Sequence, residues 1–91
     1  MTDELIKQLK DAGFPLRKEA GAIKPPVLTE LIAACDDGFW SLRRTPENKW
    51  LASGHFPVKE GQIPYYESAT YDEPEVAVAE LYLAMKLYES K

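Results

Sequence analysis

FWSLRRTPENKWLASGHF, residues 39–56, is the stretch that decides the fold, because its side chains alternate with the period of two that is typical of β-strands. Pro46 suits the second position of a type I turn, and Asn48 tolerates the left-handed conformation that follows. These residues predict a hairpin with a three-residue loop and a bulge. The loop fixes the register, and the predicted pairs are Arg44 with Trp50, Leu42 with Ala52 and Trp40 with Gly54.

This register divides the hairpin into two faces, one expected to be covered and the other mostly exposed to solvent. The residues expected on the covered face are Trp40, Leu42, Trp50, Ala52 and Phe56. The residues expected on the exposed face are Ser41, Arg43, Lys49, Leu51, Ser53 and His55. After a connection over residues 57–62, residues 63–71 predict a third strand, with Pro64 at its start. Tyr65, Ala69 and Tyr71 are expected to alternate with Tyr66, Ser68 and Thr70 on the two faces of this strand.

The C-terminal segment predicts a long helix that runs from Asp72 to about Glu89. Asp72 is expected to cap it, with Glu75 completing a capping box and Pro74 in the first turn. At helical spacing a broad apolar arc holds Ala77, Val78, Leu81, Ala84, Met85 and Tyr88, and the opposite polar arc holds Tyr82, Lys86 and Glu89. Val76, Leu83 and Leu87 form a narrower apolar stripe, and Glu80 falls between the two apolar surfaces. We expect the broad arc on the sheet and the stripe against a neighbouring helix or a partner.

The N-terminal half predicts two short helices. Residues 4–12 form the first, stopped by Gly13 with Phe14 folding back on Leu9. Residues 14–26 are expected to be an ordered linker, and a second helix runs from Val27, which cannot cap it, to about Cys35. The fold expected for residues 1–91 is therefore a single α+β domain in the order ααβββα, with a three-stranded antiparallel sheet and the last helix packed on it.

The composition narrows the classes of function. Ninety-one residues with 45% apolar content are enough for one core. Apolar runs are too short for a membrane helix, and the acidic, amphipathic N-terminus does not resemble a signal peptide, so a cytoplasmic protein is expected. The single Cys35 and single His55 provide neither a disulfide nor a zinc site, and we expect no cofactor and no metal.

Three residue groups are candidates for catalysis, and none has the required surroundings. Ser53 and His55 lie two apart on one strand without an acid to orient the imidazole. Glu80 has no second acid or base near it in the pattern. Cys35 lies on an apolar helix face before two aspartates, which would raise the pKa of the thiol, so it is expected in the core. No catalytic residue is therefore predicted, and the chain is not expected to be an enzyme.

Nucleic-acid binding is the alternative function. A helix, three antiparallel strands and a final helix is the order found in double-stranded RNA-binding domains, and the hairpin offers Arg43, Arg44 and Lys49 as a basic patch. Such domains need a basic start to their last helix, but here that start is Asp72, Glu73, Pro74 and Glu75. The net charge of −4 also opposes attraction to phosphates, so nucleic acid is not the expected partner.

Three segments carry a resemblance: LTELIAAC (28–35), FWSLRRTPENKWLAS (39–53) and EPEVAVAELYLAMK (73–86). Together they resemble a family of short uncharacterised phage and prophage proteins. In that family a Pro-Thr-Leu-Ser-Glu-Leu-Ile segment precedes a Trp-bearing hairpin, and Pro-Glu-Glu-Ala-Val-Ala precedes Leu-Trp-Leu-Ala-Leu. This chain departs from the pattern at Val27, Val76 and Tyr82. The resemblance implies an accessory protein of a mobile element in a bacterial cytoplasm, with no assigned activity.

The favoured function is therefore a non-enzymatic protein that acts by protein-protein interaction or self-association. Val76, Glu80, Leu83 and Leu87 are the predicted partner-binding residues. The aromatic residues of the sheet are a second indication of a binding surface, because so small a core cannot bury all of their rings. The rings in question are those of Trp40, Trp50, Tyr65 and Tyr66.

Overall fold

The structure, a computed structural model, describes residues 1–55 and 65–89. In chain order the elements are α1 (Asp3–Asp11), β1 (Lys18–Glu19), β2 (Ala22–Ile23), α2 (Leu28–Cys35), a single 3₁₀ turn η1 (Asp36–Gly38), β3 (Phe39–Arg44), β4 (Trp50–His55), β5 (Tyr65–Glu67) and α3 (Pro74–Glu89). The predicted α+β class is confirmed, whereas the predicted order lacks β1 and β2. The predictions for Phe56, for residues 57–64 and for the side chains of Tyr88 and Glu89 lie outside what the structure describes.

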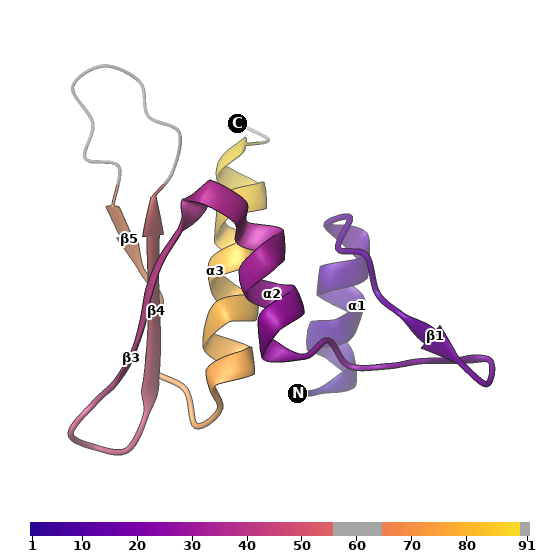
Figure 1. The fold of residues 1–91 in the computed structure, drawn as a ribbon, viewed down its shortest axis with the longest axis horizontal. Coiled ribbons are helices and arrows are strands. Elements are labelled where there is room, and N and C mark those ends of the chain that lie inside the picture. Colours follow the sequence, from indigo (N-terminus) through magenta and orange to yellow (C-terminus); the bar gives the residue numbers. More distant parts are fainter. Residues whose placement is uncertain (56–64, 90–91) are drawn as a thin grey trace.

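The strands β3, β4 and β5 form an antiparallel sheet with β4 in the centre. Helix α3 packs along β4, and α2 and α1 pack against α3, so the helices lie on one side of the sheet (Figure 1). Among the described residues no helix covers the opposite side, which we call the open face. The buried core between the sheet and the helices consists of Leu5, Leu9, Phe14, Leu31, Cys35, Ala52, Ala77, Val78, Ala79, Leu81, Tyr82 and Met85.

The β3–β4 hairpin has the predicted loop but not the whole predicted register. Asn48 has a φ of +62°, and the Thr45 N–H donates to the Lys49 carbonyl at 2.8 Å. The predicted pairs of Arg44 with Trp50 and of Leu42 with Ala52 are confirmed. The third is wrong, because Phe39 pairs with Gly54 and the strand bulges at Trp40. The bulge displaces Trp40 to the open face, contrary to its predicted covered position.

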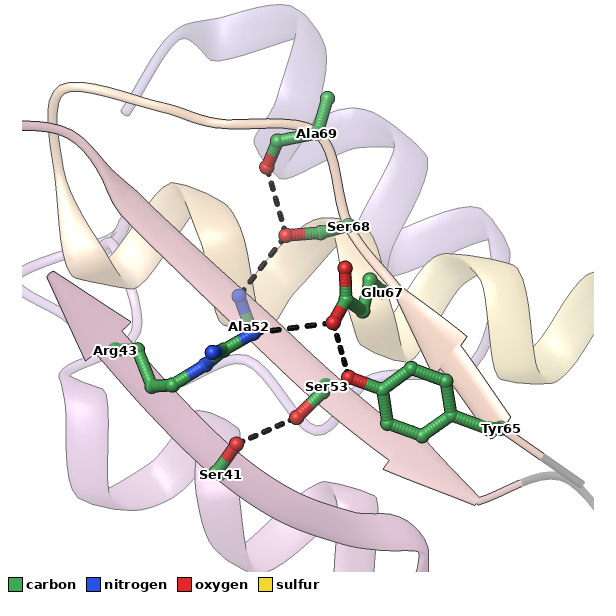
Figure 2. A network of polar contacts seen from close by, with 8 residues as sticks. All are labelled: Ser41, Arg43, Ala52, Ser53, Tyr65, Glu67, Ser68 and Ala69. Carbon is green, nitrogen blue, oxygen red and sulfur yellow. Dashed lines mark hydrogen bonds and ion pairs between the residues drawn. The ribbon is translucent and has the colours of Figure 1, made fainter. Parts of the chain in front are cut away.

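The predicted third strand is shorter than expected, because its pairing with β4 changes at Ser68. The Ser68 N–H donates to the Ala52 carbonyl at 2.8 Å, and its Oγ accepts from the Ala52 N–H at 3.0 Å and donates to the Ala69 carbonyl (Figure 2). The Ser68 side-chain oxygen thus accepts the hydrogen bond that a backbone carbonyl would accept in a regular strand. The interruption breaks the predicted alternation, so that Tyr66 and Tyr71, an odd number of residues apart, both pack against the core.

The N-terminal helix ends as predicted. The Phe14 N–H donates to the Leu9 carbonyl at 2.9 Å, and Gly13 has a φ of +91°. The linker, by contrast, contains the unpredicted hairpin β1–β2. Its turn residues Ala20 and Gly21 both have positive φ, as a type I′ turn requires.

The α2 helix lacks a side-chain cap at Val27, as predicted. Glu30 replaces part of that cap, because its Oε1 accepts from the Val27 N–H at 2.9 Å. Its other oxygen pairs with Arg17 Nε at 2.9 Å. Glu30 therefore joins the linker to the start of α2.

Helix α3 differs from its prediction at two positions. It begins at Pro74, so Glu73 and not Asp72 precedes the first turn; the Asp72 carboxylate pairs instead with Lys49. Tyr82, predicted on the polar arc, is only 3% exposed, because its ring meets Phe14 edge-on with the centroids 5.2 Å apart. The segment after α1 thus covers a side of α3 that was expected to face water.

Candidate functional site

The open face carries three aromatic rings in contact, which we call the aromatic cluster: Trp40, His55 and Tyr65. The centroids of Trp40 and His55 are 4.5 Å apart, and those of Trp40 and Tyr65 are 5.2 Å apart at 82°. The Trp40 side chain is nevertheless 56% exposed and Tyr65 is 39% exposed. The rings therefore support one another while leaving much of their surface to solvent.

A polar network adjoins the aromatic cluster on the same face (Figure 2). Glu67 Oε1 accepts from Arg43 Nη2 at 3.0 Å and from the hydroxyl of Tyr65. The bond to Glu67 raises the pKa of the Tyr65 phenol, because the carboxylate favours the protonated form. Ser41 and Ser53 share a hydroxyl hydrogen bond of 2.5 Å across the two strands. These contacts fix the directions of Arg43 and Tyr65 on the sheet.

The three residues of the nucleic-acid alternative do not form one free basic patch. Arg43 pairs with Glu67 and Lys49 pairs with Asp72. The guanidinium of Arg44 lies 5.7 Å from the centroid of the Trp50 ring. Two of the three predicted phosphate contacts are thus already bound to carboxylates.

The residues considered for catalysis are also placed by the structure. The Ser53 hydroxyl bonds to Ser41, and the imidazole of His55 lies against the Trp40 ring. Cys35 is buried, as predicted, and burial raises the pKa of its thiol to about 11, against a smaller lowering by Lys86. A thiol in that state is a poor nucleophile at neutral pH.

The predicted partner-binding residues lie together along one side of α3. Val76 and Leu83 are half-buried, Glu80 lies between them, and Leu87 is 63% exposed. They line a groove that α3 forms with α1 and with the segment around Tyr66. This groove and the open face are separated by the sheet.

Sequence reasoning missed the composition of the open face. The sequence pattern predicts Trp40 on the covered face and does not predict the role of Glu67, which organises the polar network. The alternation of the segment after residue 65 would have placed Tyr65 and Glu67 on one face. The sequence carries no simple signal for the bulge at Trp40, which allows both Phe39 and Leu42 to pack against the core.

The residues that the structure describes form a small α+β fold in which no helix covers one face of the sheet and a groove runs along the last helix (Figure 1). Comparison of the chain with protein-family models, with curated proteins and with solved structures found no match. In the part of the chain that the structure describes, no helix has the length and apolar character needed to cross a membrane.

Proposed function

We propose that this chain is a non-enzymatic protein-interaction module that contacts its partner through the open face of the sheet. The observation that supports the proposal is the exposure of Trp40 and Tyr65 on a face that no helix among residues 1–55 and 65–89 covers (Figure 1). Tryptophan, tyrosine and arginine contribute most of the binding energy at many protein interfaces. Trp40, Tyr65 and the adjacent Arg43 supply this combination within one surface.

The polar network supports the same proposal through its effect on binding entropy. Ordering a flexible side chain at an interface costs about 0.5–1.5 kcal/mol. Glu67 already holds Arg43 and Tyr65, and His55 already supports Trp40. A partner would therefore meet side chains that have lost much of their freedom before binding.

The resemblance of three sequence segments to short phage and prophage proteins adds a setting to this proposal. We place the module in a bacterial cytoplasm as an accessory protein of a mobile element. The nucleic-acid alternative has less support, because Arg43 and Lys49 are paired with carboxylates and the net charge is −4. A phosphate that binds Arg43 or Lys49 would first have to displace the carboxylate that is paired with it.

The test is affinity capture from lysates of phage-infected or lysogenic bacteria with quantitative mass spectrometry. The bait with Trp40→Ser and Tyr65→Ser removes the aromatic surface, and a Val27→Ser bait removes an exposed apolar side chain outside both surfaces. We expect a protein that the wild-type and Val27→Ser baits retain and the open-face bait loses. Identical retention by all three baits would refute the proposed use of the open face.

Two further measurements separate the other classes of partner. Sedimentation of the purified chain identifies self-association, which would appear as a dimer that the open-face substitutions convert to a monomer. Gel-shift assays with duplex and single-stranded nucleic acids at low salt are expected to show no binding. A shift that is lost in Arg43→Glu and Arg44→Glu would favour the nucleic-acid alternative instead.

A further inference from the structure

The groove along α3 is a second surface that the proposed function does not use. It consists of two adjoining hollows of about 590 Å³ and 740 Å³ that share Gln8 of α1 and Glu80 of α3. One hollow extends toward the amino-terminal end of α3 at Val76, and the other toward Leu87. Since a helix rises 1.5 Å per residue, these two positions are roughly 16 Å apart. The groove is long enough for about three helical turns of a bound segment.

Apolar side chains of α3 lie in the groove on both sides of Glu80. Val76 lies in one hollow and Leu83 and Leu87 lie in the other. With Glu80 between Val76 and Leu83, the four residues follow one another at intervals of four, three and four, so they form a continuous stripe on the helix surface. Such a stripe is the kind of surface on which an amphipathic helix lays its apolar side.

The charged residues that line the groove are mostly acidic. Glu4, Asp72 and Glu73 line one hollow and Asp11 lines the other. The amino group of Met1 pairs with Glu73 at 3.1 Å and Lys49 pairs with Asp72, so the negative charge of the groove comes mainly from Glu4, Asp11 and Glu80. Lys86 also lines the groove, with its Nζ 5.4 Å from the centroid of the Tyr82 ring. The field in the groove therefore favours a cationic occupant.

Glu80 lies in the middle of the groove, where the two hollows meet. It is half-buried, and among the described residues no hydrogen bond or ion pair to its carboxylate is found. Burial raises the pKa of its carboxyl group. Burial, and then the charge of Glu80, raise the pKa of both Tyr66 and Tyr71. A carboxylate next to aromatic rings is a suitable receptor for an ammonium or guanidinium group.

We infer that the groove along α3 binds a basic amphipathic segment of a protein partner, whose apolar side chains cover Val76, Leu83 and Leu87 and whose lysine or arginine pairs with Glu80. A second copy of this chain is a poorer occupant, because the chain itself carries a net charge of −4. The inference does not depend on the open face, which lies on the other side of the sheet. A chain that uses both surfaces would connect two partners.

The test uses a synthetic amphipathic helical peptide of leucine and lysine, titrated into the isotope-labelled full chain and followed by NMR and calorimetry. We expect amide shift changes centred on residues 76–87, with binding that weakens as salt is added. Glu80→Gln is expected to weaken binding about tenfold or more, the effect of losing a buried charge pair. Glu47→Gln removes the same charge from the exposed hairpin loop and is expected to leave binding unchanged.

Two outcomes would overturn the inference. One is equal weakening by Glu80→Gln and Glu47→Gln, which would mean that only the net charge attracts the peptide. The other is equal binding of a peptide in which glutamate replaces every lysine. Leu87→Ser provides a second variant that leaves the core intact, and it is expected to weaken binding. Trp40→Ala is expected to bind the peptide normally, so failure here is distinguishable from failure of the open-face proposal.

Discussion

Phe39 and Leu42 are three residues apart in β3, yet both side chains pack against the core. In a regular strand, side chains three residues apart point to opposite faces of the sheet. The bulge at Trp40 removes this conflict, because it adds one residue to β3 between the pairs Phe39–Gly54 and Ser41–Ser53. The same bulge turns Trp40 to the open face. The packing of β3 on the helices thus creates the aromatic cluster on the other side of the sheet.

This placement predicts that the two tryptophans differ in their contribution to stability. Trp40→Ala is expected to lower the free energy of unfolding by about 1 kcal/mol, the worth of its ring contacts. Trp50→Ala is expected to lower it by about 3 kcal/mol, because Trp50 packs against the core. Urea denaturation of the two variants measures both values. Equal losses would contradict the assignment of the two rings to opposite faces.

Gly54 is predicted to be necessary for the approach of β4 to η1 and α3. A Cβ at this position would collide with the Gly38 carbonyl oxygen and lie 3.1 Å from Leu81 Cδ1. Gly54→Ala is expected to cost about 1–3 kcal/mol of stability, as overpacking does. Because the nearest obstacle is backbone, the cost should persist when Leu81→Ala is also present. A double-mutant cycle by denaturation checks this, and a full rescue by Leu81→Ala would show that the side chain is the obstacle.

Ser68 is predicted to stabilise the sheet through its side chain. Its Oγ is the acceptor for the buried N–H of Ala52. Ser68→Ala removes that acceptor and is expected to lower the free energy of unfolding by about 1–3 kcal/mol. Thr70→Ala, an exposed hydroxyl two residues away, is the control and should change it little. Hydrogen exchange of the Ala52 amide gives an independent readout, with faster exchange expected in Ser68→Ala.

The sequence predicts the parts of this fold that depend on local chemistry. The Asn48 turn, the Gly13 stop and the burial of Cys35 each follow from one residue and its immediate neighbours. Two of the errors concern Trp40 and Tyr82, whose positions depend on segments distant in the sequence. Trp40 is displaced by a bulge that fits β3 to the helices, and Tyr82 is covered by Phe14. Periodicity within one segment contains no information about such contacts.

The two candidate surfaces also differ in how far the sequence predicts them. The stripe on α3 is visible in the sequence, because helical spacing alone brings Val76, Leu83 and Leu87 together. The aromatic cluster is not visible as such, since it requires the bulge and the pairing of β5 with β4. The position of Tyr71 beside Glu80 requires the interruption at Ser68. Both surfaces therefore owe part of their composition to irregularities in the sheet.

Cys35 is predicted to make stability depend on pH in the alkaline range. Its pKa is raised from 9.0 to about 11 in the folded chain, so between these values the unfolded chain releases the proton first. The native state then holds more protons, and stability falls as the pH rises through this window. The expected loss between pH 8 and pH 10.5 is about 2 kcal/mol. Denaturation of wild type and Cys35→Ala at both pH values isolates the contribution of Cys35 to this loss, because any contribution of Tyr66 and Tyr71 is common to both proteins. Parallel losses in the two proteins would assign the effect to other groups.

Glu80 is predicted to lower the stability of the free protein at neutral pH. Burial raises the pKa of its carboxyl group in the folded chain, so stability is greatest where the group is protonated and falls as the pH rises through the unfolded and then the folded pKa. Glu80→Gln keeps the shape without the charge and is expected to be more stable than wild type at pH 7 and equal to it at pH 3. Glu47→Gln, in the exposed loop, should match wild type at both values. Chemical denaturation at the two pH values measures these differences.

The sign of this effect connects stability with the inferred partner. A carboxylate that costs free energy in the free chain recovers it when a cation pairs with it, so Glu80→Gln should gain stability and lose affinity for the basic peptide together. If Glu80→Gln is instead less stable than wild type at pH 7, the carboxylate already makes a favourable contact within the free chain. A partner's lysine or arginine would then have to displace that contact, and the reason for a cationic occupant of the groove would disappear.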